Sequence, residues 1–386
     1  MSHPVQEIRI LHRGGIYPNK YGGNLRTLNI ARLTMGIFEQ TTIFSLGNSI
    51  EFEGNISGVT VIQEKELSNV WQRYRYYLHA MTAKEVVIPY MKRAFVHPED
   101  CLFQIEDPRF FPLLKKNHIS RFILDEQNVN WERYDFPQID LKQNVYAKMV
   151  YRREKENEKQ ALLHAAHVLC CSSRDRNILA DEVPEIENRI SVIPNCVNLH
   201  EFDNTHESTD PWKNSPEKGR ILFIGLMAYP PNTEAAQLIC NSIAPQNPDL
   251  DFLIIGKNPP KVVYPENVRF LGYVDDVIPV MAGADICLAP IRSGSGTRIK
   301  ILEYMAMGKP VISTSKGAEG IECTNGLNII IEDSIEKYPE IIRELLDNEK
   351  KRAALGREAR KLISGKYDWE LYRDSLKKIY LNILHS

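Results

Sequence analysis

The chain has 386 residues, of which 43% are hydrophobic and 25% are charged. A chain of this length and composition can bury more than one sizeable core, so disorder and a single small domain are both excluded. Lysine and arginine number 48 against 50 aspartate and glutamate residues, which leaves a formal net charge of −2. The overall charge therefore gives no reason to expect nucleic acid as a partner, and any anion-binding site must be local.

The first residues, MSHPVQEIRILHRGG, lack the basic region and long apolar core of an export signal. No stretch reaches the roughly 18 apolar residues that a membrane-spanning helix needs. The seven cysteines are an odd number without a CxxC pair, which favours free thiols in a reducing cytosol. The ten histidines include no HExxH motif. We therefore expect a cytoplasmic protein that needs no metal ion and no other cofactor.

Short apolar runs rich in β-branched residues recur through the first half of the chain and predict buried strands. They lie at residues 8–11, 41–46, 59–62, 102–105, 121–124, 168–172 and 190–193. After Pro194 and Asn195 the sequence becomes polar, as expected for a connection between domains.

A second series of predicted strands follows, at residues 220–225, 252–256, 268–271, 286–290, 311–314 and 327–331. Helical patterns separate the strands, as at 232–243, 298–307 and 335–346. Strands and helices that alternate in two separate series predict two doubly wound α/β domains, joined near residues 194–218. Because ligands bind at the carboxyl ends of parallel strands, we expect the functional site in a cleft between the two domains.

The segment at residues 285–310 combines a strand, a Gly/Ser loop and a helix that stops before Gly308 and Pro310. Gly294 and Gly296 allow a tight turn, and the N–H groups at the start of the helix form a site for a phosphate or diphosphate. Arg298 and Lys300 add positive charge there. The segment therefore predicts an anion-binding site.

Glu303 is the unusual residue of this helix because its face otherwise carries Ile299, Ala306 and Met307. A carboxylate on an apolar face needs a hydrogen-bond donor, and the vicinal hydroxyls of a ribose would supply two. The alternative interpretation is a surface ion pair between Lys300 and Glu303.

Other phosphate-binding and metal-binding motifs do not fit. The run from Gly294 has GxG but carries Ile299 where GxGxxG requires its last glycine, and no Gly-Lys-Ser/Thr P-loop occurs. Asp249 and Asp251 form a DxD, but it precedes a predicted strand and belongs to a surface loop. A dinucleotide oxidoreductase and a P-loop NTPase are therefore disfavoured.

The second half of the chain resembles the retaining, two-domain GT-B glycosyltransferases of family 4, also called glycosyl transferases group 1. The matching segments are RILFIGLMAYPPN, DFLIIG, VRFLGYVDD, ADICLAPIRSGSGTRIKILEYMAMGKPVISTSKGAEGI and KYDWELYRDSLKKIY. In the first half, YGGNLRTLNIARL, VLCCSSRDR and IPNCVNLHEF are compatible. The resemblance implies an acceptor-side Rossmann-like domain at 1–195 and a nucleotide-sugar-binding one at 196–366, with a C-terminal helix at 367–386 that packs back on the first.

The resemblance also implies site residues in three groups. The catalytic group is Arg298, Lys300 and Glu303, the last on the donor ribose. The donor-binding group is Gly22, Gly23, Gly225, Val274, Ser295, Gly296, Thr297 and Ile299, with Val274 beside the base. The group on the sugar or acceptor side is Asn24, Arg26, Gln127 and Asn128.

This sequence departs from the family pattern at three places. Ser295 stands where many members have a second glutamate, and Met227 and Ala228 stand where many have a basic phosphate ligand. Gln127 stands where related sequences often have a histidine. A glutamine cannot shuttle a proton, although it can still hydrogen-bond a sugar hydroxyl.

The resemblance implies transfer of a sugar from a nucleotide diphosphate donor to a glycan or lipid-linked acceptor, with retention and without a metal. Two alternatives stay open: a sugar-nucleotide epimerase of the same architecture, with acid/base carboxylates among Asp125, Glu126 and Glu303, and a non-catalytic sugar-nucleotide-binding protein. The basic, aromatic stretch at 71–95 is typical either of a helix packed in a core, which we favour, or of a peripheral contact with the inner face of an anionic membrane.

Overall fold

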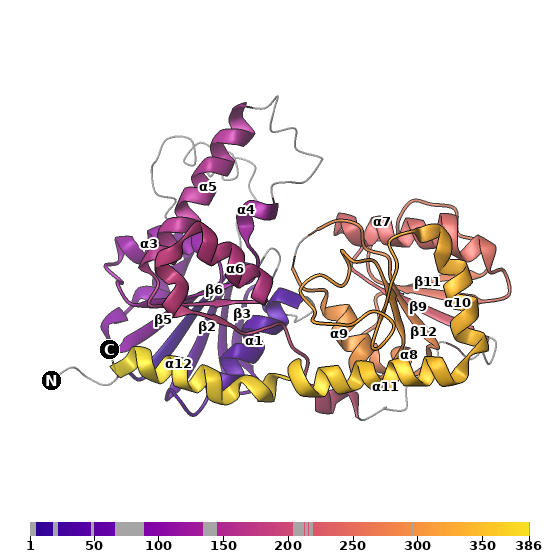
Figure 1. Cartoon of the computed structure of the whole chain (residues 1–386). Coiled ribbons are helices and arrows are strands. Elements are labelled where there is room, and N and C mark those ends of the chain that lie inside the picture. Colours follow the sequence, from indigo (N-terminus) through magenta and orange to yellow (C-terminus); the bar gives the residue numbers. More distant parts are fainter. Residues whose placement is uncertain are drawn as a thin grey trace. The chain divides into compact units, whose positions relative to one another are not determined.

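The computed structural model describes residues 5–17, 22–47, 50–65, 89–133, 145–203, 212, 215, 219–294 and 296–385 (Figure 1). The chain forms two compact units. Unit 1 comprises Met1–Pro194 and Tyr372–Ser386, and unit 2 comprises Asn195–Leu371. Each unit is considered by itself below.

Unit 1 contains an eight-stranded sheet in the order β3-β4-β2-β1-β5-β6-β7-β8. Its strands are β1 (Glu7–His12), β2 (Gln40–Gly47), β3 (Phe52–Ile56), β4 (Val59–Lys65), β5 (Cys101–Ile105), β6 (Phe122–Glu126), β7 (His167–Cys170) and β8 (Ile190–Val192). All neighbouring strands pair in parallel except β3, which pairs antiparallel to β4 at the sheet edge. The carboxyl ends of seven strands therefore meet at one edge of this sheet.

The hydrophobic core of unit 1 includes Leu11, Phe103, Leu124 and Val168. The described helices of this unit pack around the sheet. They are α1 (Gly22–Thr34), α3 (Phe111–Lys116), α4 (Asn130–Arg133), α5 (Val145–His164), α6 (Ser173–Glu182) and α12 (Arg373–His385). The C-terminal helix α12 buries Leu376, Tyr380 and Ile383 in unit 1, and Tyr380 meets the ring of Phe38 edge to face at 5.8 Å.

Unit 2 contains a six-stranded, wholly parallel sheet in the order β11-β10-β9-β12-β13-β14. Its strands are β9 (Arg220–Ile224), β10 (Asp251–Ile255), β11 (Val268–Gly272), β12 (Ile286–Ala289), β13 (Val311–Ser313) and β14 (Ile330–Ile331). Its α-helices are α7 (Pro230–Leu238), α8 (Ile278–Gly283), α9 (Ile299–Ala306), α10 (Tyr338–Asp347) and α11 (Glu349–Lys366). Within this unit, α7 lies on one side of the sheet and α9 and α11 lie on the other (Figure 1).

The prediction of two doubly wound α/β domains is confirmed. The central strands of unit 2 are apolar apart from their first residue, as in β9 with the sequence RILFI and β10 with the sequence DFLII, because helices cover both faces of a doubly wound sheet. A cleft between the two units stays a prediction.

Candidate functional site

The turn between β12 and α9 has the backbone that its glycines predict. Gly294 and Gly296 have φ values of 93° and 80°, in the left-handed region that glycine adopts readily. A Cβ atom at Gly294 would also lie 2.4 Å from the hydroxyl oxygen of Tyr229, so a side chain there would require Tyr229 to move. The turn delivers the chain to Arg298, the N-cap of α9, with extended backbone. Ser295 lies outside the described residues.

Arg298 is buried, with 7% of its surface exposed, and its guanidinium group turns back onto the loop. Nη1 donates to the carbonyl of Gly296, and Nη2 donates to the carbonyl of Ser293 at 3.2 Å. Nε has no hydrogen-bond partner among the described residues, and burial lowers the pKa of the side chain. Arg298 thus fixes the loop ahead of α9, and its contact with an anion stays a prediction.

The start of α9 offers backbone N–H groups because the first N–H groups of a helix have no carbonyl partner within it. Thr297 and Ile299 lie at this end of the helix, beside Gly296. The first carbonyl to accept a hydrogen bond here is that of Arg298, which accepts from the N–H of Ile301 at 2.9 Å. No acidic residue occupies the first turn. The end of α9 therefore has the polarity that favours an anion.

Lys300 points toward the end of β9. Its Nζ donates to Oδ1 of Asn232 at 2.7 Å and lies 4.4 Å from the centroid of the Phe223 ring. Burial lowers its pKa to about 7, Arg298 lowers it further and Glu303 raises it. A Cβ atom at Gly225 would lie 3.0 Å from this Nζ, so a glycine after β9 leaves room for the lysine.

Glu303 is half-buried on α9, and its carboxylate makes no hydrogen bond or ion pair within the described part of the chain. Lys300 binds Asn232 instead, so the surface ion pair considered from the sequence does not form. Burial raises the pKa of Glu303 to about 7, Lys300 lowers it and Glu201 raises it. A half-buried carboxylate without a donor is consistent with the prediction that a ligand supplies one.

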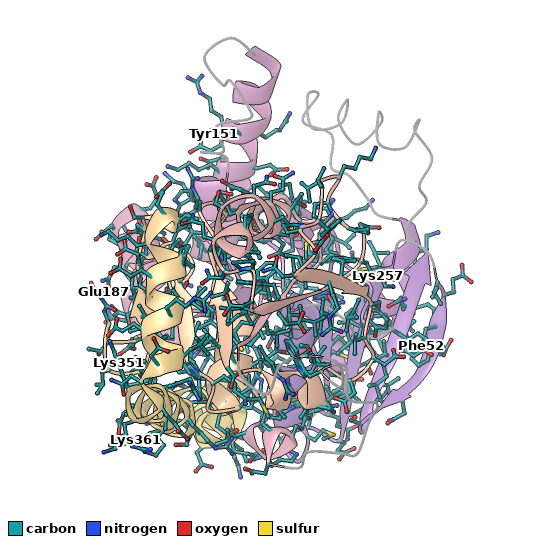
Figure 2. All side chains as sticks on the ribbon, turned by 90° about the vertical axis from the view of Figure 1, so that its right-hand side faces the viewer. Phe52, Tyr151, Glu187, Lys257, Lys351 and Lys361 are labelled. Atoms are coloured by element: carbon teal, nitrogen blue, oxygen red, sulfur yellow. The ribbon has the colours of Figure 1, made fainter. Side chains whose placement is uncertain are left out.

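The carboxyl ends of the neighbouring parallel strands β9, β10 and β11 lie at one edge of the sheet. The N–H of Gly225 donates to the carbonyl of Ile255 at 2.9 Å, and the N–H of Ile224 donates to the buried hydroxyl of Tyr304 on α9 at 2.7 Å. Val274 follows β11 and packs partly buried against the core of unit 2. Lys257, labelled in Figure 2, follows β10 and places its Nζ 4.7 Å from the ring centroid of Tyr273.

The predicted sugar-side residues of unit 1 have different surroundings. Gly22 and Gly23 begin α1. Arg26 is 1% exposed and donates to both carboxylate oxygens of Asp125, at 2.8 and 2.6 Å. Asn24 is buried and donates to the carbonyl of Gly15. A guanidinium enclosed in this way has no free face for an acceptor, so the structure gives Arg26 a structural role.

Gln127 and Asn128 follow β6 and are half-buried. Gln127 Nε2 donates to Oε2 of Glu106 at 2.7 Å and to Oγ1 of Thr27 at 3.2 Å. Thr27 Oγ1 lies 2.9 Å from Nδ1 of His12, at the end of β1. Sequence reasoning missed His12, Thr27 and Glu106, because no local motif links residues that only the sheet brings together.

Two further predictions concern metals and membranes. Among the described residues no cluster of three or more His, Cys, Asp or Glu side chains could hold a metal ion. Within the same part of the chain, the helices are too short or too polar to cross a bilayer. Of the stretch at 71–95, residues 71–88 lie outside the described residues, and Pro89–Phe95 forms 3-10 turns.

Residues 218–348 match the family model of the glycosyl transferases group 1. A GDP-mannose-dependent monoacylated alpha-(1-6)-phosphatidylinositol monomannoside mannosyltransferase of Corynebacterium glutamicum is 33% identical over 123 residues. This alignment covers 30% of the chain and 32% of that relative, so the chain spans about a third of the relative's length.

The fold of the whole chain matches solved structures at low sequence identity. Sucrose-phosphate synthase from Thermosynechococcus elongatus aligns with a TM-score of 0.72 at 14% identity, over 98% of this chain and 99% of that one. Anabaena HepE in complex with UDP-glucose aligns with a TM-score of 0.71 at 13% identity, over 97% and 99%. The GT-B fold predicted from the sequence is therefore confirmed, and unit 2 carries a domain that matches the glycosyl transferases group 1.

Proposed function

We propose that this chain is a glycosyltransferase that moves a sugar from a nucleotide diphosphate donor to a glycan or lipid-linked acceptor, with retention and without a metal. The observation that carries the proposal is the arrangement at α9. A two-glycine turn leads into the helix start, and a buried lysine lies in its first turn. One turn further, the half-buried Glu303 carboxylate has no hydrogen-bond donor among the residues that the structure describes. The match of residues 218–348 to the glycosyl transferases group 1 supports it.

The charge that develops during the reaction explains these groups. As the bond to the sugar breaks, the leaving nucleoside diphosphate gains negative charge, and groups already aimed at that charge lower the barrier. The N–H groups at the start of α9 and the Lys300 ammonium would supply this stabilisation. Glu303 would accept hydrogen bonds from both hydroxyls of the donor ribose, which fixes the diphosphate one helical turn away.

The structure weakens the epimerase alternative. An epimerase needs carboxylates that can reach the substrate, and the sequence offers Asp125, Glu126 and Glu303. Asp125 is fully buried and paired with Arg26, and Glu126 is 2% exposed. Of these three carboxylates, only Glu303 is partly exposed, so that a ligand could contact it.

A panel of nucleoside diphosphates and nucleotide sugars, including UDP-glucose and GDP-mannose, tests the donor site by thermal shift, because a ligand of the folded state raises the melting temperature. Acceptor-dependent release of nucleoside diphosphate then separates a transferase from a non-catalytic binding protein. Change of the donor sugar without acceptor would indicate an epimerase. Product anomers assigned by NMR, with and without EDTA, test retention and metal independence.

Glu303→Ala tests the ribose contact directly. We expect about 30-fold weaker binding of the selected nucleoside diphosphate, since a charged acceptor of two hydrogen bonds is lost. The 2′-deoxy analogue should bind more weakly than the ribonucleotide to the wild type but equally well to Glu303→Ala. Glu344→Gln, which alters an exposed ion pair with Lys351, is the matched control. Equal loss for the deoxy analogue in both proteins would refute the assignment.

We also propose a cytoplasmic location, with any membrane contact through residues 71–95. Co-sedimentation with vesicles of neutral lipid, and with vesicles that contain anionic lipid, tests this contact. Equal recovery of the protein with both vesicle types would contradict the proposed membrane contact.

A further inference from the structure

A buried hydrogen-bond network in unit 1 ends at Gln127 and is not used by the proposed function. It begins on α12, where the hydroxyl of Tyr380 donates to Oε1 of Gln104 at 2.5 Å. Nε2 of Gln104 donates to Oε1 of Glu106 at 2.7 Å. Oε2 of Glu106 then accepts from Gln127 at 2.7 Å. The network thus connects the C-terminal helix with the carboxyl ends of the adjacent strands β5 and β6.

Glu106 is the centre of this network. It directly follows β5, and its backbone N–H donates to the carbonyl of Leu11 at 3.0 Å, so strand pairing fixes its position. Its side chain is 7% exposed and lies between Thr27 of α1, Gln104 of β5 and Gln127, which follows β6. A buried carboxyl group is costly to keep unless its hydrogen bonds are satisfied.

The charges around Glu106 leave it as an acceptor toward Gln127. Burial raises the pKa of Glu106 well above its usual value, and the nearby Asp125 raises it further. Arg26 is held by both oxygens of Asp125, and burial keeps His12 neutral by lowering its pKa to about 4. The Glu106 carboxyl group has lone pairs for the Gln127 amide in either protonation state.

The second hydrogen bond of Gln127 also involves its amide nitrogen. Its Nε2 also donates to Thr27 Oγ1 at 3.2 Å, so both amide hydrogens are directed toward the interior. Its Oε1 has no hydrogen-bond partner among the residues the structure describes. Gln127 is itself only half-buried. The amide nitrogen of Gln127 is therefore occupied, whereas its amide oxygen is available to accept a hydrogen bond.

We propose that Glu106 is a positioning residue, which holds the amide nitrogen of Gln127 so that the amide oxygen accepts a hydrogen bond from a sugar hydroxyl. The inference rests on the proposed glycosyl transfer and deepens it. A hydroxyl is selected because an ether or a deoxy position has no hydrogen to donate. Glu106 acts through Gln127 and does not itself touch the substrate.

A double-mutant cycle on kcat/KM tests the coupling. Glu106→Ala and Gln127→Ala should each lower kcat/KM about tenfold with the nucleotide sugar selected from the panel, the size of effect expected for one hydrogen bond. The double variant should be no worse than either single one, because both changes remove the same contact. Glu106→Gln should stay within about threefold of the wild type, since a carboxamide oxygen can still accept from Gln127.

Thr34→Val is the matched control. Thr34 is a buried residue of α1 whose hydroxyl donates to the carbonyl of Ala31 and contacts Thr41, away from Gln127. It should lower the melting temperature without changing kcat/KM. Independent, multiplicative losses in the double variant, or unchanged kcat/KM in folded Glu106→Ala, would overturn the proposal.

A second measurement needs neither activity nor the alanine variant. The side-chain amide protons of Gln127, assigned by difference against Gln127→Ala in NMR spectra, should exchange slowly with water in the wild type and in Glu106→Gln. Exchange as fast as that of an exposed glutamine in the wild type would also overturn the proposal. If the wild-type chain transfers no sugar, the proposed function fails, while the exchange result still decides whether Glu106 holds Gln127.

Discussion

Lys300 and Glu303 lie one turn apart on α9, and burial drives their pKa values in opposite directions until both are about 7. A lysine with a lowered pKa loses its charge as the pH rises through 7, and a glutamate with a raised pKa gains its charge over the same range. The helix face that is predicted to hold the donor is therefore most positive below pH 7. This gives the candidate site a pH dependence of known sign.

We predict that the contribution of Lys300 to nucleoside diphosphate binding is large at pH 6 and small at pH 8.5. The ratio of Kd for Lys300→Met to Kd for the wild type should fall from about tenfold to about twofold, because only the ammonium form attracts the diphosphate. Titration calorimetry at both pH values measures it, with Lys337→Met as an exposed control. A ratio that stays constant with pH would contradict the prediction.

Glu158 on α5 gives unit 1 a pH dependence of its own. It is 1% exposed, its Oε1 accepts from the backbone N–H of Asn130 at 3.0 Å, and burial raises its pKa to about 8. The folded state therefore binds more protons than the unfolded state, and the stability from the protonated group is lost as the pH rises toward 8.

We predict that Glu158→Gln stabilises unit 1 at pH 8 and has little effect at pH 5. Glutamine keeps an oxygen for Asn130 but cannot ionise, so at pH 8 the gain should be about 1–2 kcal/mol, or a few degrees in melting temperature. Calorimetry at the two pH values measures it. A gain of equal size at both pH values would show that ionisation is not the cause.

At the scale of elements, the loops that follow β9 and β10 approach each other so closely that Gly256, the first residue after β10, cannot carry a side chain. Gly256 has a φ of 155°, and a Cβ atom built on it would lie 1.7 Å from the carbonyl oxygen of Gly225. The same Gly225 lies beside Asn232 and Lys300. The spacing of two strand ends therefore determines where the lysine of the candidate site can lie.

We predict that Gly256→Ala destabilises unit 2 by more than 2 kcal/mol and weakens nucleotide binding, because two backbone segments must separate. Gly272→Ala is the matched control, since Gly272 also has a positive φ of 71° but no atom lies within 4 Å of its built Cβ. The control should lose only about 1 kcal/mol from the backbone conformation. Denaturant unfolding and thermal shift with nucleotide measure both variants, and equal losses would refute the clash.

Local signals made most elements predictable. The turn with Gly294 and Gly296 and the helix after it could be placed to within a residue or two, because glycines and apolar periodicity are read over short windows. The edge strand β3, with the sequence FEGNI, was missed because its glycine and asparagine are poor strand formers. The helix α7 was expected to reach Ile243, but the chain changes to a π-helical turn at Ile239.

The candidate site was less predictable than the fold. Residue types near α9 indicated an anion site, but not that Arg298 donates to loop carbonyls or that Lys300 binds Asn232, 68 residues away. Arg26 was expected at the sugar and is instead paired with Asp125, 99 residues away. Such pairings depend on which strands become neighbours, and no window of sequence contains that information.

At the scale of the whole molecule, each unit has a hydrophobic core of its own, and the chain passes between the units twice, near Pro194 and near Tyr372. The second passage returns the C-terminal helix α12 to unit 1. There Tyr380 donates to the buried Gln104, and the carbonyl of Ile383 accepts from Arg121 at 3.2 Å. The C-terminal helix α12 is thus part of the packed structure of unit 1.

We predict that deletion of residues 372–386 lowers the stability of unit 1 and leaves that of unit 2 unchanged. The deletion exposes the apolar surface now covered by Leu376, Tyr380 and Ile383 and leaves Gln104 without its donor, a loss of several kcal/mol from unit 1 alone. Calorimetry should then show one transition moved to lower temperature, and only the other transition should rise on addition of the nucleoside diphosphate selected for unit 2.

The same deletion should speed the exchange of the Gln127 amide protons, because the Gln104 amide also holds Glu106. Tyr380→Phe keeps the helix and removes one hydroxyl, so it should have a smaller effect both on the stability of unit 1 and on this exchange. A single transition that shifts as a whole would mean that the two cores do not unfold separately.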